Sequence, residues 1–375
     1  MLKVLTVFGT RPEAIKMAPL IAELARHPDR IDNRNCLTGQ HQDMVAPLVS
    51  LFGIRADYEL HLMRENQTLE HITTSVLREV GEILRREKFD LLLVQGDTTT
   101  SMAAALAAFY AGVKIGHVEA GLRTFDKLQP YPEEVNRRII DSMADLYFAH
   151  SDKARRHLLN EGVPDQAIAV TGNTVIDALL DVSQRPFDLA ASPLADIPFN
   201  RKRIVLVTAH RRESFGGPFE SLCAGLAALA RRYADDVELV YPVHRNPNVR
   251  AVVGRHLDGL PNVRLLDPLD YLPLVQLMKR ATLVLTDSGG LQEEAPSLGK
   301  PVLVLRNVTE RQEGVEAGTL KLVGTDADDI VHEASRLLDD PDAYRAMATR
   351  ANPYGDGTAS ARIVRKILDS CGASA

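Results

Sequence analysis

Tryptophan is absent from this sequence and cysteine is rare, with three residues among 375. The three, Cys36, Cys223 and Cys371, are far apart and include no Cys-x-x-Cys pair. This spacing indicates neither a disulfide framework nor a cysteine-based zinc site. Isolated thiols fit a reducing compartment, so the expected location is the cytoplasm.

Long apolar runs are also absent. The opening run, Met1–Gly9, is too short for the apolar region and cleavage site of a signal peptide, and no run approaches the roughly 20 apolar residues of a membrane span. We therefore expect no membrane association. The formal net charge of -6 gives no electrostatic support to nucleic-acid binding. It does not exclude a phosphorylated ligand, because such a ligand needs only a local cluster of donors.

Two kinds of cofactor motif are missing. The glycine fingerprint of dinucleotide binding does not follow the first predicted strand, which argues against a nicotinamide cofactor. The 11 histidines lack metal-ligand spacing such as His-Glu-x-x-His, so no metal is expected.

The order of predicted elements indicates an α/β fold with two Rossmann-like, doubly wound domains that face a cleft. Short β-rich runs alternate with helical patterns, as in parallel sheets with helices on both faces. The helix-poor stretch Ser183–Arg203 separates two such series, and the length exceeds the usual size of one core. The predicted strands are Lys3–Phe8, Asp90–Gln95, Val113–Val118, Leu146–Ala149, Ile204–Thr208, Val237–Pro242, Val263–Leu266, Leu283–Thr286 and Val302–Leu305. The predicted helices are Ala14–Ala25, Leu69–Arg86, Ser101–Ala111, Val135–Ser142, Phe219–Tyr233, Leu272–Lys279, Leu291–Leu298, Ala327–Leu338 and Thr358–Leu368. We divide the chain into residues 1–170 with 353–375, and residues 171–352.

Functional residues are sought just after strands, because open α/β sheets bind ligands at the carboxyl ends of their strands. The first strand is followed by Gly9–Lys16, in which Thr10 and Glu13 have the spacing of a capping box. The amides at this helix start, with the charges of Arg11 and Lys16, indicate an anion site. A well-capped helix with solvated basic residues is the alternative.

Three acids follow later strands of the first domain. Asp97 stands where a carboxylate would point into the cleft, or where it would cap the next helix. Glu119 is bracketed by small residues, and an ion pair with Arg123 is the alternative to a functional role. Glu133 opens a helix whose dipole favours acids in its first turn. Several carboxylates in one cleft can divide acid and base roles if their environments separate their pKa values.

The second domain carries basic and glycine-rich turns after its strands. His210 is interpreted as an acid/base or a phosphate donor, with a surface histidine beside two arginines as the alternative. The strongest anion signal is the Ser-Gly-Gly turn at residues 288–290, where missing Cβ atoms let a diphosphate approach the amides of a helix start. A tight β–α turn is the alternative there. Glu294 is placed to accept from ribose hydroxyls, and Arg311 to contact phosphate.

Nine motifs, in order along nearly the whole chain, resemble those of the non-hydrolysing UDP-N-acetylglucosamine 2-epimerases of bacteria. They are VFGTRPEAIKMAPL, GDTTT, GHVEAGLRT, YPEEVNRR, TGNTVIDALL, AHRRESFG, YPVHRNPNVR, LTDSGGLQEEAPSLGKPVLVLRNVTER and NPYGDG. The resemblance implies a glycosyltransferase-B fold, a homodimer and no redox cofactor. It implies reversible conversion of UDP-N-acetylglucosamine to UDP-N-acetylmannosamine, which would supply N-acetylmannosamine units for cell-surface polysaccharide.

Site roles are implied by the same resemblance, motif by motif. The implied acid/base carboxylates are Asp97, Glu119 and Glu133, and His210 is implied as an essential cleft residue near the diphosphate. The residues implied to bind the UDP moiety are Arg11, Lys16, Ser288, Gly289, Gly290, Glu294 and Arg311. Some members bind a second UDP-N-acetylglucosamine as an allosteric activator, and the residues that match that site are Gln40, His41, Glu133, Arg211 and His244.

Two departures from the family pattern bear on ligand binding. Leu269 and Leu274 stand where some relatives have Gln and Phe near the uracil. Asp43 and Asn66 stand where members with an activator site can carry Gln and Arg. Fewer donors at these two positions would weaken the binding of a second diphosphate.

The chemistry implied by the resemblance is anti elimination of UDP across C1–C2, a bound 2-acetamidoglucal, and re-addition of UDP with a proton on the other face of C2. One rival is a UDP-sugar glycosyltransferase of the same fold, and another is a hydrolysing epimerase. A third is a UDP-sugar-binding regulator without turnover. The presence of the acids Asp97, Glu119 and Glu133 argues against this third alternative.

Overall fold

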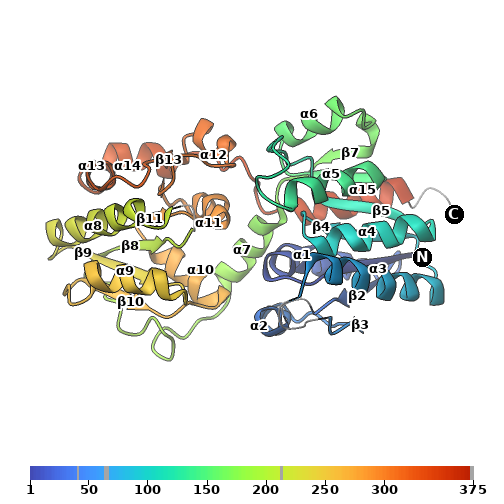
Figure 1. The fold of residues 1–375 in the computed structure, drawn as a ribbon, viewed down its shortest axis with the longest axis horizontal. Coiled ribbons are helices and arrows are strands. Elements are labelled where there is room, and N and C mark those ends of the chain that lie inside the picture. Colours follow the sequence, from blue (N-terminus) through green and yellow to red (C-terminus); the bar gives the residue numbers. More distant parts are fainter. Residues whose placement is uncertain (40–41, 63–66, 212–213, 372–375) are drawn as a thin grey trace. The chain divides into compact units, whose positions relative to one another are not determined.

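The computed structural model describes residues 1–39, 42–62, 67–211 and 214–371. The chain forms two compact units: unit 1 contains residues 1–178 and the segment from 354 onward, and unit 2 contains residues 179–353. Each unit holds one all-parallel sheet, so the predicted α/β class with two doubly wound domains is confirmed (Figure 1). The division of functional domains after residues 170 and 352 stays a prediction.

Unit 1 is built on a sheet with the strand order β3-β2-β1-β4-β5-β6-β7. Its strands are β1 (Leu2–Phe8), β2 (Ile31–Leu37), β3 (Tyr58–Glu59), β4 (Leu91–Gln95), β5 (Lys114–Ala120), β6 (Leu146–Ala149) and β7 (Ile168–Val170). The β4 sequence, Leu-Leu-Leu-Val-Gln, is buried at every position, which is typical of a strand covered on both faces.

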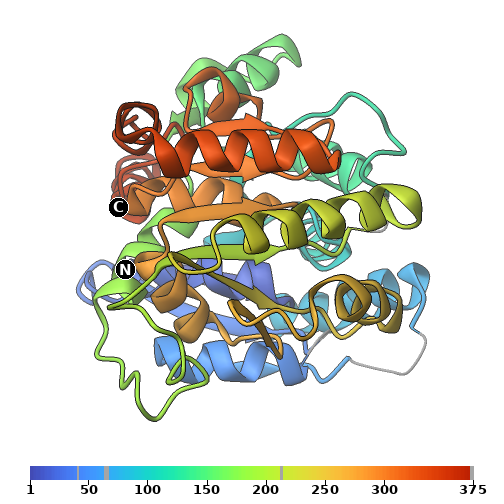
Figure 2. The ribbon, with the colours of Figure 1, turned by 90° about the vertical axis from the view of Figure 1, so that its left-hand side faces the viewer.

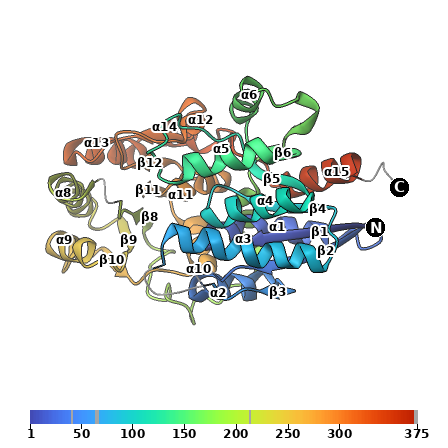
Figure 3. The ribbon, with the colours of Figure 1, turned by 45° about the vertical axis from the view of Figure 1, so that its right-hand side comes forward.

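Helices pack on both faces of the unit 1 sheet. They are α1 (Arg11–Leu24), α2 (Gln42–Phe52), α3 (Leu69–Arg86), α4 (Thr99–Ala111), α5 (Glu133–Met143), α6 (Asp152–Asn160), α7 (Thr174–Gln184) and α15 (Ala359–Cys371). Figure 3 shows α3, α4 and α5 side by side over the sheet, while α1 packs with α2 and α15. The α7 helix continues across the unit boundary, which falls within it.

Unit 2 repeats this architecture with the strand order β10-β9-β8-β11-β12-β13. Its strands are β8 (Arg203–Thr208), β9 (Val237–Pro242), β10 (Val263–Leu266), β11 (Leu283–Thr286), β12 (Val302–Val304) and β13 (Leu320–Leu322). Its helices are α8 (Gly217–Arg232), α9 (Pro247–Leu257), α10 (Tyr271–Arg280), α11 (Gly289–Glu294), α12 (Gln312–Glu316), α13 (Ala327–Asp339) and α14 (Pro341–Ala348). Figure 2 shows α8 between α9 and α13, where buried side chains such as Leu226 and Ile330 form the core with the strands.

Both sheets reverse their strand order beside their first strand. The reversal lies between β1 and β4 in unit 1 and between β8 and β11 in unit 2. Ligands of open α/β sheets bind in the crevice outside the carboxyl ends of the strands at such a switch point. The turns that follow these four strands therefore define where a site is expected. None of the helices within the described ranges has the length and apolar character needed to cross a membrane.

Candidate active site

The loop after β1 is held by an internal carboxylate. Glu13 is buried, and its Oε2 accepts the backbone N–H groups of Gly9 at 2.9 Å and Thr10 at 2.7 Å, so the predicted capping box is present. Its Oε1 accepts hydrogen bonds from the hydroxyls of Thr98 at 2.5 Å and Ser101 at 2.8 Å, in the turn after β4. Two amides of the loop before α1 thus bind the chain's own carboxylate, which also ties this loop to the turn after β4.

Glu119 is the most constrained acid of unit 1. It lies in β5 with a φ of 70°, a left-handed conformation that is rare for residues other than glycine and that concentrates at functional sites. Lys16 Nζ lies 2.7 Å from both carboxylate oxygens, and both side chains are largely buried. Asn173 Nδ2 donates to the same carboxylate at 3.0 Å, and Gln95 also donates to it. Three residues from separate parts of the chain therefore fix one carboxylate.

Arg123 does not pair with Glu119, so that alternative interpretation is wrong. Its guanidinium instead contacts Asp141 at 2.7 Å and Glu161 at 2.6 Å. Asp141 also lies 2.6 Å from Nδ1 of the buried His117. Burial by itself would raise the pKa of Asp141, but the charges of His117 and Arg123 hold that pKa below its ordinary value.

Asp97 is not the cap of the helix that follows it. Thr98 is the N-cap of α4, because its hydroxyl accepts the N–H of Ser101 at 3.0 Å. The Asp97 carboxylate instead pairs with Arg137 of α5, whose Nε lies 3.1 Å from Oδ2. The capping alternative is therefore wrong, and the carboxylate is held at the switch point by a buried guanidinium.

Glu133 and its neighbour Glu134 open α5, as the first-turn interpretation predicts. Glu134 is fully buried and accepts the backbone N–H groups of Thr124 at 3.0 Å and Phe125 at 3.2 Å, so it holds the preceding loop. The Oε2 of Glu133 is buried with no hydrogen-bond partner among the described residues. Glu133 thus differs from its neighbour in keeping a buried acceptor for another group.

Sequence reasoning missed two of these side chains, Arg137 and Asn173. Both occur inside quoted motifs, YPEEVNRR and TGNTVIDALL, but nothing in their local pattern predicted which acid each would contact.

Glu119 Oε2 lies 3.6 Å from the position that a Cβ on Gly96 would take, next to Asp97. The fold therefore brings Lys16, Asp97 and Glu119 together at one edge of the unit 1 sheet.

In unit 2, the turns after β8 and β11 are joined by Asp287. Its Oδ2 accepts the backbone N–H groups of His210 at 2.6 Å and Arg211 at 2.7 Å. The His210 ring stacks on the ring of His244, which follows β9, with centroids 4.9 Å apart and an interplanar angle of 5°. His210 is thus stacked on a second histidine, with its backbone N–H bound to Asp287.

The Ser-Gly-Gly turn begins α11, with Ser288 at the N-cap and Gly289 as the first helical residue. A Cβ on Gly289 would lie 3.1 Å from Cζ of Arg311, so a larger residue there would require the end of the Arg311 side chain to shift. Arg311 Nε donates to Glu293 at 2.9 Å. Glu294 is buried and accepts the hydroxyl of Tyr271 at 2.6 Å.

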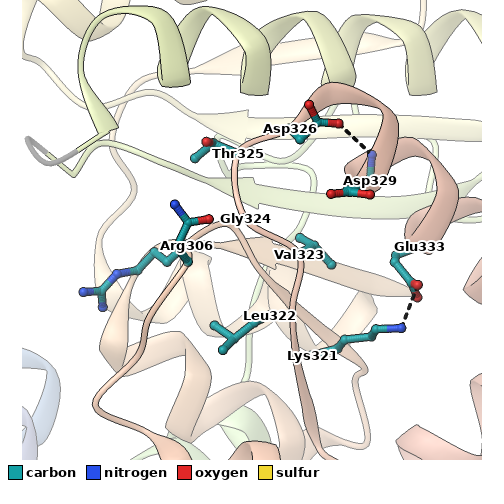
Figure 4. Close-up of a pocket in the computed structure, with 10 residues that line it drawn as sticks. Arg306, Lys321, Leu322, Val323, Gly324, Thr325, Asp326, Asp329 and Glu333 are labelled. Atoms are coloured by element: carbon teal, nitrogen blue, oxygen red, sulfur yellow. Dashed lines mark hydrogen bonds and ion pairs between the residues drawn. The ribbon is translucent and has the colours of Figure 1, made fainter.

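Two cavities lie away from the predicted site residues. One of about 470 Å³ is at the ends of β12 and β13, where Lys321 pairs with Glu333 and Asp326 caps α13 (Figure 4). Another of about 440 Å³ lies beside α2. Neither cavity is lined by a residue to which the sequence assigned a catalytic or binding role.

Some predicted positions lie outside the described residues. These are Gln40 and His41 of the allosteric set and Asn66 of the departures. Of the remaining allosteric set, Arg211 and His244 lie in the unit 2 cluster described above. Of the two uracil positions, Leu269 is buried and Leu274 is on α10.

Comparison with known proteins identifies the family. The profile of UDP-N-acetylglucosamine 2-epimerases matches residues 22–368. A UDP-N-acetylglucosamine 2-epimerase of Escherichia coli K12 is 52% identical over 374 residues, covering 98% of this chain and 99% of that one. The chain belongs to the UDP-N-acetylglucosamine 2-epimerase family. The predicted resemblance and the predicted enzyme class, an isomerase, are thereby confirmed.

Solved structures agree with this membership. A UDP-GlcNAc 2-epimerase from Neisseria meningitidis bound to UDP-GlcNAc has a TM-score of 0.89 and 46% identity, covering 98% of this chain and 100% of that one. A Methanocaldococcus jannaschii UDP-GlcNAc 2-epimerase in complex with UDP-GlcNAc and UDP has a TM-score of 0.80 and 32% identity, with the same coverage.

Proposed function

We propose that this chain interconverts UDP-N-acetylglucosamine and UDP-N-acetylmannosamine by inverting C2 of the sugar. Elimination of UDP gives a bound 2-acetamidoglucal, and UDP then adds back with a proton on the other face. The observation that carries the proposal is the pair of carboxylates at the unit 1 switch point, Asp97 and Glu119, each held by its own largely buried cation.

The elimination route follows from the chemistry of the sugar. The hydrogen on C2 is not next to a carbonyl, so direct removal is difficult. Departure of UDP from C1 builds positive character that acidifies this hydrogen, and donors around the diphosphate stabilise the leaving group. Carboxylates must then serve both faces of C2. Glu133, whose buried Oε2 has no hydrogen-bond partner within the described part of the chain, is the third that we assign to this role.

The UDP moiety is assigned to Arg11 and Lys16 of unit 1 and to the turns of unit 2. There Ser288, Gly289 and Gly290 begin α11, whose helix start favours an anion. Glu294, with one carboxylate oxygen held by a tyrosine hydroxyl, would accept from the ribose, and Arg311 lies against the same turn. His210 is assigned to the diphosphate.

The test is incubation with UDP-N-acetylglucosamine in heavy water, followed by proton and phosphorus NMR. We expect UDP-N-acetylmannosamine with deuterium at C2. Product without solvent deuterium would contradict the elimination route. Free N-acetylmannosamine with UDP would instead indicate a hydrolysing epimerase, and UDP release that requires an added acceptor would indicate a glycosyltransferase.

The homodimer is proposed to form through α4 and α5, which pack together in unit 1. Phe109 and Tyr110 on α4 are 57% and 71% exposed, and Val135 and Ile139 on α5 are also exposed. Exposed apolar side chains on adjacent helices mark an interaction surface. Light scattering should give twice the chain mass for the wild type and a monomer for a Phe109→Ser, Tyr110→Ser variant. A dimeric variant would exclude this face.

We further propose that the protein is cytoplasmic and that its product supplies N-acetylmannosamine units for cell-surface polysaccharide.

Activation by a second substrate molecule is expected to be weak, because Asp43 and Asn66 replace the donors of other members. Initial rates should therefore depend hyperbolically on UDP-N-acetylglucosamine, and a sigmoidal dependence would show a working second site.

A further inference from the structure

Asp287 presents a buried oxygen toward His210. The Asp287 side chain is 1% exposed, and its Oδ2 accepts two backbone N–H groups of the β8–α8 connection. Its Oδ1 has no hydrogen-bond partner among the described residues. The group that faces Oδ1 is Nδ1 of His210, at 3.6 Å. This distance is too long for a hydrogen bond, and a small rotation of the ring would close it.

The ring of His210 is held in plane but remains accessible. It stacks on His244 at an interplanar angle of 5°, and Nδ1 of His244 accepts the N–H of Asn246 at 3.1 Å, which orients that second ring. The His210 side chain is 40% exposed. One edge of the imidazole therefore faces Asp287, and the ring remains reachable for a ligand. Catalytic hydrogen bonds are often long without ligand and shorten in the complex.

We propose that Asp287 is a positioning residue for His210, whose protonated ring it orients through Nδ1–H so that Nε2–H is presented to the diphosphate of the nucleotide sugar. The assignment of the ligand rests on the proposed function, whereas the pairing of Asp287 with His210 does not. The same arrangement of carboxylate and imidazole fixes the tautomer of a catalytic histidine in unrelated hydrolases.

The charges around His210 support this role. Burial lowers the pKa of His210 below its ordinary value, and the nearby His244 and Arg211 lower it further. Asp287 acts in the opposite direction and favours the protonated ring. These groups come from the turn after β11, the turn after β9 and the connection after β8. Of these described neighbours, Asp287 is thus the group that favours a protonated His210 ring as the hydrogen-bond donor.

The test is the substitution Asp287→Asn in the full-length chain. An asparagine oxygen can still accept the two backbone N–H groups, so the fold of the turn is kept. Its NH₂ group would then face Nδ1 and favour the tautomer protonated at Nε2 in the neutral ring. Asp326→Asn is the matched control, because Asp326 also accepts two backbone N–H groups, at 2.9 and 3.2 Å, at the start of α13 (Figure 4).

Imidazole NMR of ligand-free protein reports the pairing directly, with the His210 signal assigned from a His210→Asn variant. We expect the pKa of His210 to fall in Asp287→Asn and to stay unchanged in Asp326→Asn. An unchanged or raised pKa of His210 in Asp287→Asn would overturn the pairing, whether or not the chain is an epimerase.

Kinetics report the consequence for the reaction. Since the proposed active form has a protonated His210, the basic limb of kcat against pH should move to lower pH in Asp287→Asn. We expect kcat at pH 8 to fall by about tenfold or more while KM changes little. A normal profile with an unchanged kcat would overturn the positioning role, and absence of epimerisation by the wild type would overturn the proposed function instead.

Discussion

Replacing Lys16 by methionine should leave the largely buried carboxylate of Glu119 without the compensating charge of the lysine. Lys16 Nζ lies 2.7 Å from both oxygens of Glu119, and the two side chains are 14% and 8% exposed. Methionine keeps most of the length and apolar contact of the lysine stem but removes its charge. Glu119 would then keep only neutral donors from Asn173 and Gln95 among the contacts described above.

The magnitude follows from the burial of the pair. Removing one partner of a buried ion pair costs roughly 3–5 kcal/mol. Because two neutral donors remain on Glu119, we expect the lower end, about 3 kcal/mol. For a unit of this size each kcal/mol shifts the melting temperature by roughly 2–4 °C, so unit 1 should melt about 6–12 °C lower.

The assay is differential scanning calorimetry of wild type, Lys16→Met, Glu119→Gln and the double variant. If the cost arises from an unpaired charge, the double variant should be more stable than Lys16→Met alone, because a neutral amide replaces the stranded carboxylate. A double variant whose loss equals or exceeds the sum of the two single losses would refute the reasoning. All three variants should lose turnover.

Three further predictions concern stability and thiol reactivity. Gly121 has a φ of 81°, and a Cβ there would lie 2.4 Å from the carbonyl oxygen of Ala154. Gly121→Ala should therefore lower the unfolding free energy by about 3 kcal/mol in denaturant titrations, and a loss below about 1 kcal/mol would contradict this contact. Burial would raise the pKa of Glu310, but hydrogen bonding to Arg306 lowers it to about 2 from its ordinary 4.5. The stabilisation by the Glu310 carboxylate is therefore present above about pH 4.5 and lost as pH falls toward 2. The difference in melting temperature between wild type and Glu310→Gln should shrink from pH 6 to pH 3, and a constant difference would argue against this ion pair. A thiol reagent applied to native protein should label Cys371, which is half-buried, before the two fully buried cysteines, whose pKa values are raised to about 12 by burial; equal rates by mass spectrometry would refute this order.

Much of the fold follows from short-range sequence patterns. Buried strands such as Leu91–Gln95 are continuous apolar runs and were predicted within a few residues of their ends. Helices α2, α6, α7, α9, α12 and α14 and the short strands β3, β7 and β13 were not predicted. The strand Ile31–Leu37 was missed because Asp32 to Asn35 are all polar. These side chains are satisfied by distant partners: Asn35 accepts the hydroxyl of Thr6 at 2.7 Å and donates to the carbonyl of Arg55 at 2.8 Å.

The candidate site was predictable to the extent that its residues follow strands. Asp97, Glu119 and His210 each stand in or after a strand end, and that placement is local information. Their partners are not local: Arg137 lies 40 positions from Asp97, and Asp287 lies 77 positions from His210. Which cation meets which acid depends on strand order in the sheet, and the spacing of residues in one sequence does not encode that order.

The central claim is that the bond between C1 and the diphosphate oxygen breaks and re-forms within the site. It is tested most directly with UDP-N-acetylglucosamine that carries oxygen-18 in the bridge between C1 and the β-phosphorus. During turnover, phosphorus NMR should show the label spreading from the bridge to the non-bridging oxygens of the β-phosphate, because UDP rotates before it adds back. Inversion at C2 with the label still confined to the bridge would contradict the account.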